Sequence, residues 1–141
     1  MNLYAESSAV LSWLLGEPTS PAVRAPLASA RRVFASDLTL VESDRVLIRA
    51  VSQASLSETA AADRRATLSA ATAHWDLLRV DEQVIERARR PFPIEPIRSL
   101  DALHLATALV LRSATPGLAL LSLDRRVRDN ARQLGFVVLP D

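Results

Sequence analysis

The sequence contains no cysteine and no lysine, and each absence excludes a class of chemistry. Without cysteine the chain forms no disulfide and no thiolate metal site, which argues against zinc. Without lysine, no reaction that needs a lysine amine is available, and all 17 basic residues are arginine. Genome-level composition bias is the simplest account of an all-arginine set. Arginine nevertheless suits phosphate, which its planar guanidinium binds through two parallel hydrogen bonds.

Long apolar runs and a strong net charge are also missing. No uninterrupted apolar run approaches the roughly 18 residues that cross a bilayer. The N-terminal sequence MNLYAESS lacks the basic start of a secretory signal, so a cytoplasmic location is expected. The formal net charge is +1, so the chain is not basic overall as many DNA-binding domains are. With 49% apolar residues and no repeat or linker, one domain over residues 1–141 is predicted.

Short apolar runs alternate with helical patterns along the chain, which predicts an α/β fold with a parallel sheet and helices on both faces. Strands are predicted over residues 3–5, 32–35, 77–80, 118–123 and 136–139. Helices are predicted over residues 9–15, 22–29, 37–53, 57–73, 81–90, 97–111 and 124–134. The predicted core face of the helix over 37–53 comprises Leu40, Val41, Leu47, Ile48 and Val51.

The stretch over residues 97–111, IRSLDALHLATALVL, organises the chain. Ser99 is a good N-cap, and nearly every later residue is apolar, which predicts a helix buried on most of its circumference. Asp101, His104 and Thr107 interrupt this pattern at intervals of three and form a polar stripe. Asp101 either lies in a first turn, where the helix dipole stabilises it by roughly 0.3–1 kcal/mol, or joins carboxylates around a cation. For His104, a polar residue lining the pocket wall is favoured over a metal ligand.

Three further acids fall near the ends of predicted elements. Glu6 follows the first strand, Asp124 follows the fourth, and Glu42 lies early in the helix after the second. Ligands of open α/β sheets bind beyond the carboxyl ends of the strands, where the strand order reverses. If the first and fourth strands are neighbours, these acids and Asp101 all open towards one edge of the sheet. Clustered carboxylates repel one another unless a cation intervenes, and oxygen ligands suit Mg²⁺ or Mn²⁺.

Each acid also has a purely structural interpretation. Glu42 could pair on the surface with Arg45, which would contribute about 0.2–0.5 kcal/mol. Asp124 could be an ordinary helix N-cap. Glu6 is the hardest to explain in this way, because it interrupts the exit of a buried strand.

Four segments resemble the motifs of PIN-domain nucleases. LYAESSAVLSWLLGEP resembles their opening, in which a short strand ends in an acid followed by a small hydroxyl residue. LTLVESDRVLIRA resembles the second acidic motif and SLDALHLATAL the third, which is the most specific of the set. LLSLDRRVRDNARQLGFVVL resembles the fourth motif and the closing strand. The resemblance covers almost the whole chain, and its size and layout are most similar to VapC-type toxins of toxin–antitoxin pairs.

This resemblance implies a PIN-like three-layer α/β/α fold with a five-stranded parallel sheet, the first strand central beside the fourth. It implies a Mg²⁺- or Mn²⁺-dependent endoribonuclease toxin directed at tRNA or rRNA. It also implies a homodimer that a cognate antitoxin neutralises, as a heterotetramer or a larger complex. The four acidic metal-binding positions fall on Glu6, Glu42, Asp101 and Asp124. The small hydroxyl positions that support the first and last acids fall on Ser8 and Ser122.

One position departs from the family pattern. The family more often has aspartate where this chain has Glu6, and the extra methylene moves the carboxylate by about one bond length, to which metal geometry is sensitive. The alternative function is therefore a catalytically impaired PIN-fold module that acts through antitoxin or RNA binding, although retention of all four acids argues against it. A phosphoacceptor signalling domain also gathers acids at strand ends, but it needs a lysine that this chain lacks.

Overall fold

The computed structural model describes residues 1–141 and contains one five-stranded sheet. The strands are β1 (Asn2–Ala5), β2 (Arg32–Ser36), β3 (Asp76–Leu78), β4 (Leu118–Leu121) and β5 (Val137–Leu139). Every pairing is parallel, and the order across the sheet is β3-β2-β1-β4-β5. The predicted parallel sheet is confirmed, with β1 central beside β4. The strand order reverses between these two strands, which is where ligands bind in open α/β sheets.

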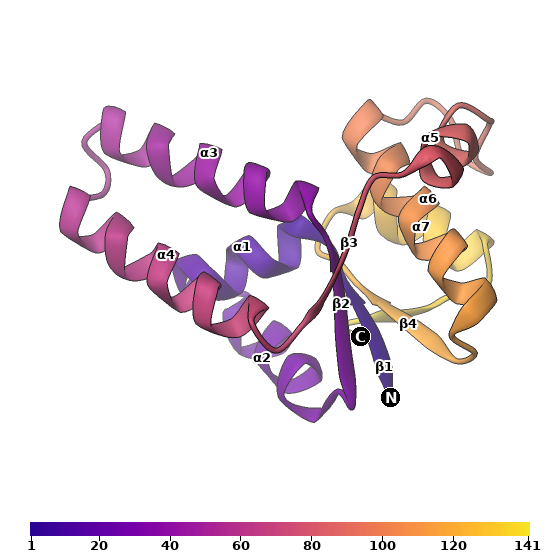
Figure 1. Cartoon of the computed structure of the whole chain (residues 1–141), viewed down its shortest axis with the longest axis horizontal. Helices are drawn as coiled ribbons and strands as arrows, with labels where there is room; N and C mark the ends of the chain where they lie inside the picture. The colour runs from indigo at the N-terminus through magenta and orange to yellow at the C-terminus, as the bar shows by residue number, and fades with distance from the viewer.

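Seven helices cover the two faces of this sheet. They are α1 (Ser7–Leu15), α2 (Ser20–Ser29), α3 (Leu38–Ser52), α4 (Glu58–Thr72), α5 (Glu82–Ala88), α6 (Ser99–Ala114) and α7 (Arg125–Gln133). Figure 1 shows α1 to α4 on one side of the sheet and α5 to α7 on the other. The predicted three-layer α/β/α architecture is therefore confirmed.

The central strands are buried on both faces, and their side chains alternate between two cores. Leu3 of β1 packs in one cluster with Leu121 and with Val23 of α2. Tyr4, the next residue, points the other way and packs with Leu120 and the apolar face of α6. Leu120 has no exposed surface, so truncating it to alanine would cost about 2–5 kcal/mol of folding free energy.

Local signals fix most of the helix ends. Gly16 ends α1 in the left-handed conformation, with φ at 64°, which a glycine adopts without steric cost. Ser57 caps α4 by accepting a hydrogen bond from the N–H of Ala60, as predicted. The prediction that Ser99 caps α6 is wrong: Ser99 is the first helical residue, and Arg98 holds the N-cap position without a side-chain cap bond. The extended backbone of Arg98 starts the helix one residue early, and its carbonyl accepts from Ala102.

The predicted core face of α3 is partly wrong. Leu47 is fully buried as expected, but Val41 and Ile48 are 59% and 42% exposed. The buried face instead follows Thr39, Ser43 and Leu47, which are spaced four residues apart. The apolar pattern misled the prediction because two of the inward positions carry small hydroxyl residues.

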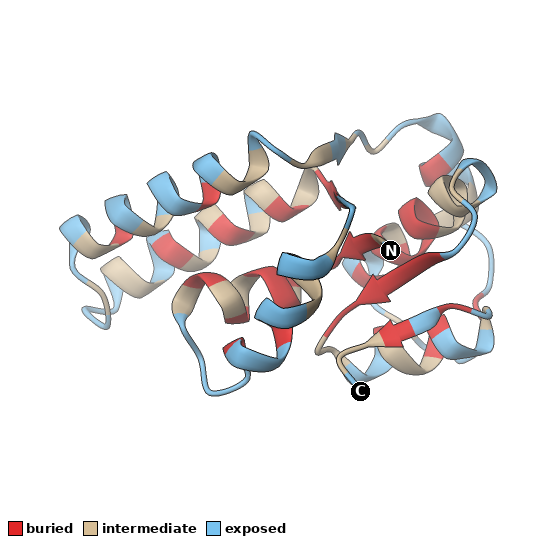
Figure 2. Ribbon diagram, turned by 90° about the horizontal axis from the view of Figure 1, so that it is seen from below, coloured by how far each residue is buried: buried red, intermediate tan, exposed pale blue.

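The α3–α4 hairpin extends away from the sheet, and Figure 2 shows that its outer turns are largely exposed. The helix α2 begins at Ser20, two residues before the predicted start, and Pro21 lies in its first turn, where no backbone N–H is needed. None of the helices combines the length and apolar composition needed to cross a bilayer.

Candidate functional site

The four predicted acids line one cavity of about 360 Å³ at the carboxyl edge of the sheet. Glu6 directly follows β1, and Asp124 lies between β4 and α7. Glu42 belongs to the second turn of α3, and Asp101 to the first turn of α6. The remaining residues that line the cavity are Ser7, Ser8, Leu11, Arg98, Ser99 and Leu100. The structure thus brings the four acids together, while their function as metal ligands stays a prediction.

Glu6 is held by two serine hydroxyls where β1 and β4 end. The oxygen Oε2 of Glu6 accepts hydrogen bonds from the hydroxyls of Ser8 and Ser122, the latter at 2.7 Å. The oxygen of Ser8 also accepts from the backbone N–H groups of Leu123 at 2.9 Å and Asp124 at 3.2 Å. Glu6 is only 4% exposed, so these donors compensate for the lost hydration of its carboxylate. The positions of Ser8 and Ser122 match the supporting function that the sequence suggested.

Glu42 is fixed by a buried histidine rather than by the surface arginine considered above. Its Oε1 lies 2.6 Å from Nε2 of His104 and accepts a hydrogen bond from Ser7 at 2.9 Å. Because a carboxylate only accepts, His104 Nε2 carries the proton in this contact. Burial alone would raise the pKa of Glu42, but the hydrogen bond and charge of His104 and the bond from Ser7 lower it below its ordinary value. Glu42 is thereby kept ionised and aimed at the cavity.

His104 connects Glu42 to the core. It is 1% exposed, and its Nδ1 lies 2.9 Å from the hydroxyl of Tyr4, which is fully buried on β1. Burial raises the pKa of the Tyr4 phenol well above its ordinary value, so the hydroxyl keeps its proton. His104 is a hydrogen-bonded polar residue, as predicted, but it does not line the cavity: it lies behind Glu42, in direct contact with that acid.

Asp101 and Asp124 share one arginine. Arg98 Nε lies 3.1 Å from Oδ2 of Asp101, and Arg98 Nη2 lies 3.1 Å from Oδ2 of Asp124. Hydrogen bonding to Asp101 and the charges of both aspartates raise the pKa of Arg98. The other oxygen of Asp124 accepts from the N–H of Val127, so this residue also caps α7. Asp124 is therefore both the N-cap of α7 and a residue that lines the cavity.

A divalent cation would suit the donors of this cavity, which are carboxylates. No three His, Asp or Glu side chains converge closely enough to ligate one ion in this arrangement. Instead the guanidinium of Arg98 lies between the carboxylates of Asp101 and Asp124 and neutralises part of their charge. The carboxylates of the cavity fit Mg²⁺ or Mn²⁺ chemically, and in this structure the positive charge beside them is that of Arg98.

Three residues of the site were not singled out from the sequence, namely Ser7, Tyr4 and Arg98. Ser7 lies between two residues that were singled out, and Tyr4 stands inside a strand where an aromatic residue is unremarkable. Arg98 carried a signal, since an arginine three residues before an aspartate lies within reach of it on a helix. The contact from Arg98 to Asp124 has no local signal, because it spans 26 residues.

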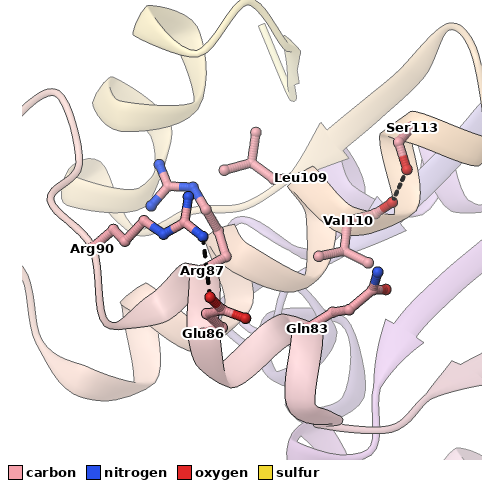
Figure 3. A pocket seen from close by; sticks show the side chains of 7 residues that line it. All are labelled: Gln83, Glu86, Arg87, Arg90, Leu109, Val110 and Ser113. Atoms are coloured by element: carbon pink, nitrogen blue, oxygen red, sulfur yellow. Dashed lines mark hydrogen bonds and ion pairs between the residues drawn. The ribbon is translucent and has the colours of Figure 1, made fainter.

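A second hollow of about 330 Å³ lies between α5 and α6. Figure 3 shows Glu86 pointing toward Arg90, with the side chains of Leu109, Val110 and Ser113 on the facing helix. The Glu86–Arg90 ion pair measures 3.4 Å and both side chains are more than 60% exposed. This hollow contains none of the predicted site residues.

Known proteins resemble the chain in sequence and in fold. The PIN domain family model matches residues 3–133. Ribonuclease VapC46 of Mycobacterium tuberculosis is 37% identical over 137 residues, which are 97% of this chain and 95% of that protein. Two solved structures share the fold at lower identity. They are M. tuberculosis VapC20, a sarcin-ricin loop cleaving toxin (TM-score 0.68, 18% identity, 99% of both chains), and a toxin–antitoxin complex from Klebsiella pneumoniae (TM-score 0.65, 17% identity, 100% and 98%).

The family match spans the strands and helices that build the acidic cavity, from Leu3 in β1 to the last residue of α7. The similarity to VapC46 extends over nearly the full length of both proteins. The chain belongs to the PIN-domain family, and within it is a VapC-like protein.

Proposed function

We propose that this protein is a Mg²⁺- or Mn²⁺-dependent endoribonuclease and the toxin of a toxin–antitoxin pair. The observation that carries the proposal is that Glu6, Glu42, Asp101 and Asp124 line one cavity at the switch point of the sheet. Similarity to a ribonuclease over 97% of the chain supports the same activity. Retention of four acids favours this function over a PIN-fold module that only binds.

In the proposed mechanism, Glu6, Asp101 and Asp124 would hold the cation, and Glu42 would complete the set directly or through water. The bound ion would polarise the scissile phosphate and lower the pKa of a water molecule. The protein contributes orientation: the hydroxyls of Ser8 and Ser122 occupy one oxygen of Glu6 and leave Oε1 free of protein hydrogen bonds. His104 keeps Glu42 ionised, so the Glu42 carboxylate would be able to accept a hydrogen bond from a water molecule in the cavity.

The substrate would be RNA, with tRNA or rRNA as the expected class. The solved toxin VapC20, which cleaves the sarcin-ricin loop, shares the fold and supports an RNA loop as target. Unpaired RNA presents its backbone and bases to a cleft more freely than a duplex does. Hydrolysis in line with the leaving oxygen would leave a 5′-phosphate and a 3′-hydroxyl.

An antitoxin is the proposed partner, and the toxin itself is proposed to be a homodimer. The similar fold found in a toxin–antitoxin complex supports the first of these. A neutralising segment would cover the acidic cavity, which is open at the ends of β1 and β4.

The decisive experiment measures cleavage of total RNA by purified protein free of any antitoxin. Cleavage should require added Mg²⁺ or Mn²⁺ and should stop with a chelator, and sequencing of product ends should find 5′-phosphates. Activity that survives exhaustive chelation would contradict the metal mechanism. Metal binding with no cleavage of any RNA would favour the binding-module alternative.

A further inference from the structure

Arg98 is the only basic side chain that lines the acidic cavity. Its guanidinium forms hydrogen bonds of 3.1 Å to Asp101 through Nε and 3.1 Å to Asp124 through Nη2. The same two carboxylates are proposed as metal ligands. A guanidinium and a divalent cation cannot both hold the same oxygens, because like charges at that distance repel.

The backbone that precedes Arg98 is firmly anchored, whereas the Arg98 side chain is held only by its two carboxylate partners. The carboxylate of Glu95 accepts hydrogen bonds from the N–H groups of Phe92 and Ile97, at 2.9 and 3.0 Å. The side-chain amide of the fully buried Asn130 of α7 accepts from the N–H of Ile94 at 2.8 Å and donates to the carbonyl of Ile94 at 2.9 Å. The side chain of Arg98 is nevertheless 64% exposed. The guanidinium is thus open to solvent, and its two ion pairs with Asp101 and Asp124 are the contacts that hold it in place.

When a cation holds Asp101 and Asp124, Arg98 and the start of α6 are available to bind an external anion. Arg98 occupies the N-cap position of α6 and no side chain caps that helix, so the first-turn N–H groups lack a side-chain acceptor. The positive end of the α6 dipole and the guanidinium both lie at the opening of the cavity, beside Ser99 and Leu100. These are the features that receive a phosphate group.

We propose that Arg98 is an exchangeable counterion of the active site. In the metal-free protein it pairs with Asp101 and Asp124; when a divalent cation binds, it is displaced and instead binds a phosphate of the RNA backbone. This inference rests on the proposed function and names a residue that serves the cation site and the substrate in turn. Metal loading and RNA binding are therefore coupled through one side chain.

The first test measures Mn²⁺ affinity by calorimetry, without RNA, for the wild type, Arg98→Gln, Arg98→Lys and Arg125→Gln. Arg125 is a matched control, because it adjoins Asp124, is 94% exposed and lies outside the cavity. Arg98→Gln should bind Mn²⁺ roughly threefold to tenfold more tightly, since exposed ion pairs with two carboxylates no longer compete. Arg98→Lys should lie nearer the wild type, and Arg125→Gln should match it.

Metal-free Arg98→Gln should also melt below the wild type, because its clustered carboxylates have lost their counterion, and Mn²⁺ should raise its melting temperature by more than that of the wild type. The second test measures the binding of a labelled single-stranded oligoribonucleotide of mixed sequence by anisotropy in saturating Ca²⁺, before any cleavage is detected. Here Arg98→Gln should bind more weakly than the wild type. A residue with a merely structural role would not raise the affinity for Mn²⁺ and lower the affinity for RNA when it is replaced.

Equal or weaker Mn²⁺ binding by Arg98→Gln would overturn the inference, since Arg98 would then support the acids rather than compete for them. Tighter Mn²⁺ binding with unchanged RNA affinity would overturn the exchange to phosphate. If neither the wild type nor Arg98→Gln binds Mn²⁺, the proposed function fails and the inference fails with it. If both bind Mn²⁺ equally and the wild type cleaves RNA, the inference alone fails.

Discussion

The acidic cavity and the α5–α6 hollow are nearly equal in volume, about 360 and 330 Å³, yet they are built differently. In the hollow of Figure 3 the polar contacts are local: Glu86 pairs with Arg90 one turn away, and Ser113 donates to the carbonyl of Val110. In the acidic cavity the contacts join distant segments. Ser122 donates to Glu6 across 116 residues, and His104 contacts Glu42 across 62.

Hydrogen bonds from distant residues to buried charged groups therefore identify the candidate site better than the volume of the cavity does. A buried carboxylate is costly unless hydrogen bonds replace its hydration. Glu6 is 4% exposed and accepts from Ser122 across 116 residues, whereas Asp101, 6% exposed, pairs with Arg98, which in turn reaches the distant Asp124. Glu86 remains in water and needs no distant partner. Clustering buried carboxylates costs folding free energy, which indicates a role for them other than stability.

The largest expected effect comes from Asp101→Asn, which keeps the shape of the side chain and removes its charge. Cleavage should fall by a factor on the order of a thousand, because the metal supplies several kcal/mol of transition-state stabilisation. The matched control is Glu86→Gln, the same loss of charge in the hollow of Figure 3, which should cut at the wild-type rate. Rates are measured with Mg²⁺ on a defined RNA. Equal rates for both variants would abolish the distinction between the two cavities.

Two changes of Glu6 separate charge from reach. Glu6→Gln should lose cleavage nearly as completely as Asp101→Asn, since it removes another proposed ligand. Glu6→Asp should retain measurable cleavage, because the family more often uses aspartate at this position. Cleavage rate and melting temperature, each with and without Mg²⁺, are the measurements. A Glu6→Gln protein that melts lower but cuts normally would make Glu6 a structural residue.

His104 tests whether the long-range contacts serve activity. His104→Leu should lower kcat about 10- to 100-fold through loss of the bond that orients Glu42. It should also cost about 1–3 kcal/mol of unfolding free energy, because the Tyr4 hydroxyl and Glu42 lose a partner. Tyr4→Phe, the control, removes only the outer contact and should reduce kcat less. If His104→Gln, which keeps an N–H donor, recovers no activity over leucine, His104 does not act by positioning Glu42.

The smallest effect concerns pH. The folded-state pKa of Glu42 is lowered, so the stability that its contacts contribute is present above the ordinary glutamate pKa of about 4.3 and is lost as the pH falls through the lower folded value. The difference in unfolding free energy between wild type and Glu42→Gln should therefore shrink as the pH falls below about 4. Urea unfolding at several pH values measures it. A difference that stays constant over this range would contradict the lowered pKa.

The sheet and most helices could be predicted from the sequence because their signals are local or periodic. Buried strands such as β4 read as short apolar runs, and caps such as Ser57 are marked by residue type. The sequence places the helix α3 correctly, but its inner face only in part, since Leu47 is buried while Val41 and Ile48 are exposed. Periodic apolar residues mark a core face only when the neighbouring layer is apolar, and beside the cavity Thr39 takes an inward position and bonds to Ser7.

The acidic residues of the candidate site could be predicted from the sequence, but their side-chain contacts could not. Glu6 and Asp124 could be placed at strand ends from the alternation of elements and the resemblance to a family. The contacts that set their state could not, because Arg98 reaches Asp124 and His104 reaches Glu42 only after the sheet has closed. Side-chain pairs between distant segments depend on register, which short strands do not encode locally.

The position of β1 in the middle of the sheet also limits when the acidic cavity can be completed during synthesis. β1 leaves the ribosome first, but its neighbour β4 begins at Leu118, so one edge of β1 stays unpaired through most of translation. Glu6 and Asp124 therefore meet only after nearly the whole chain has emerged. A nascent chain that pauses before that point contains Glu6 and Glu42 but not the assembled acidic cavity. Under the proposed function, this strand order would prevent the nascent chain from cleaving the RNA that encodes it.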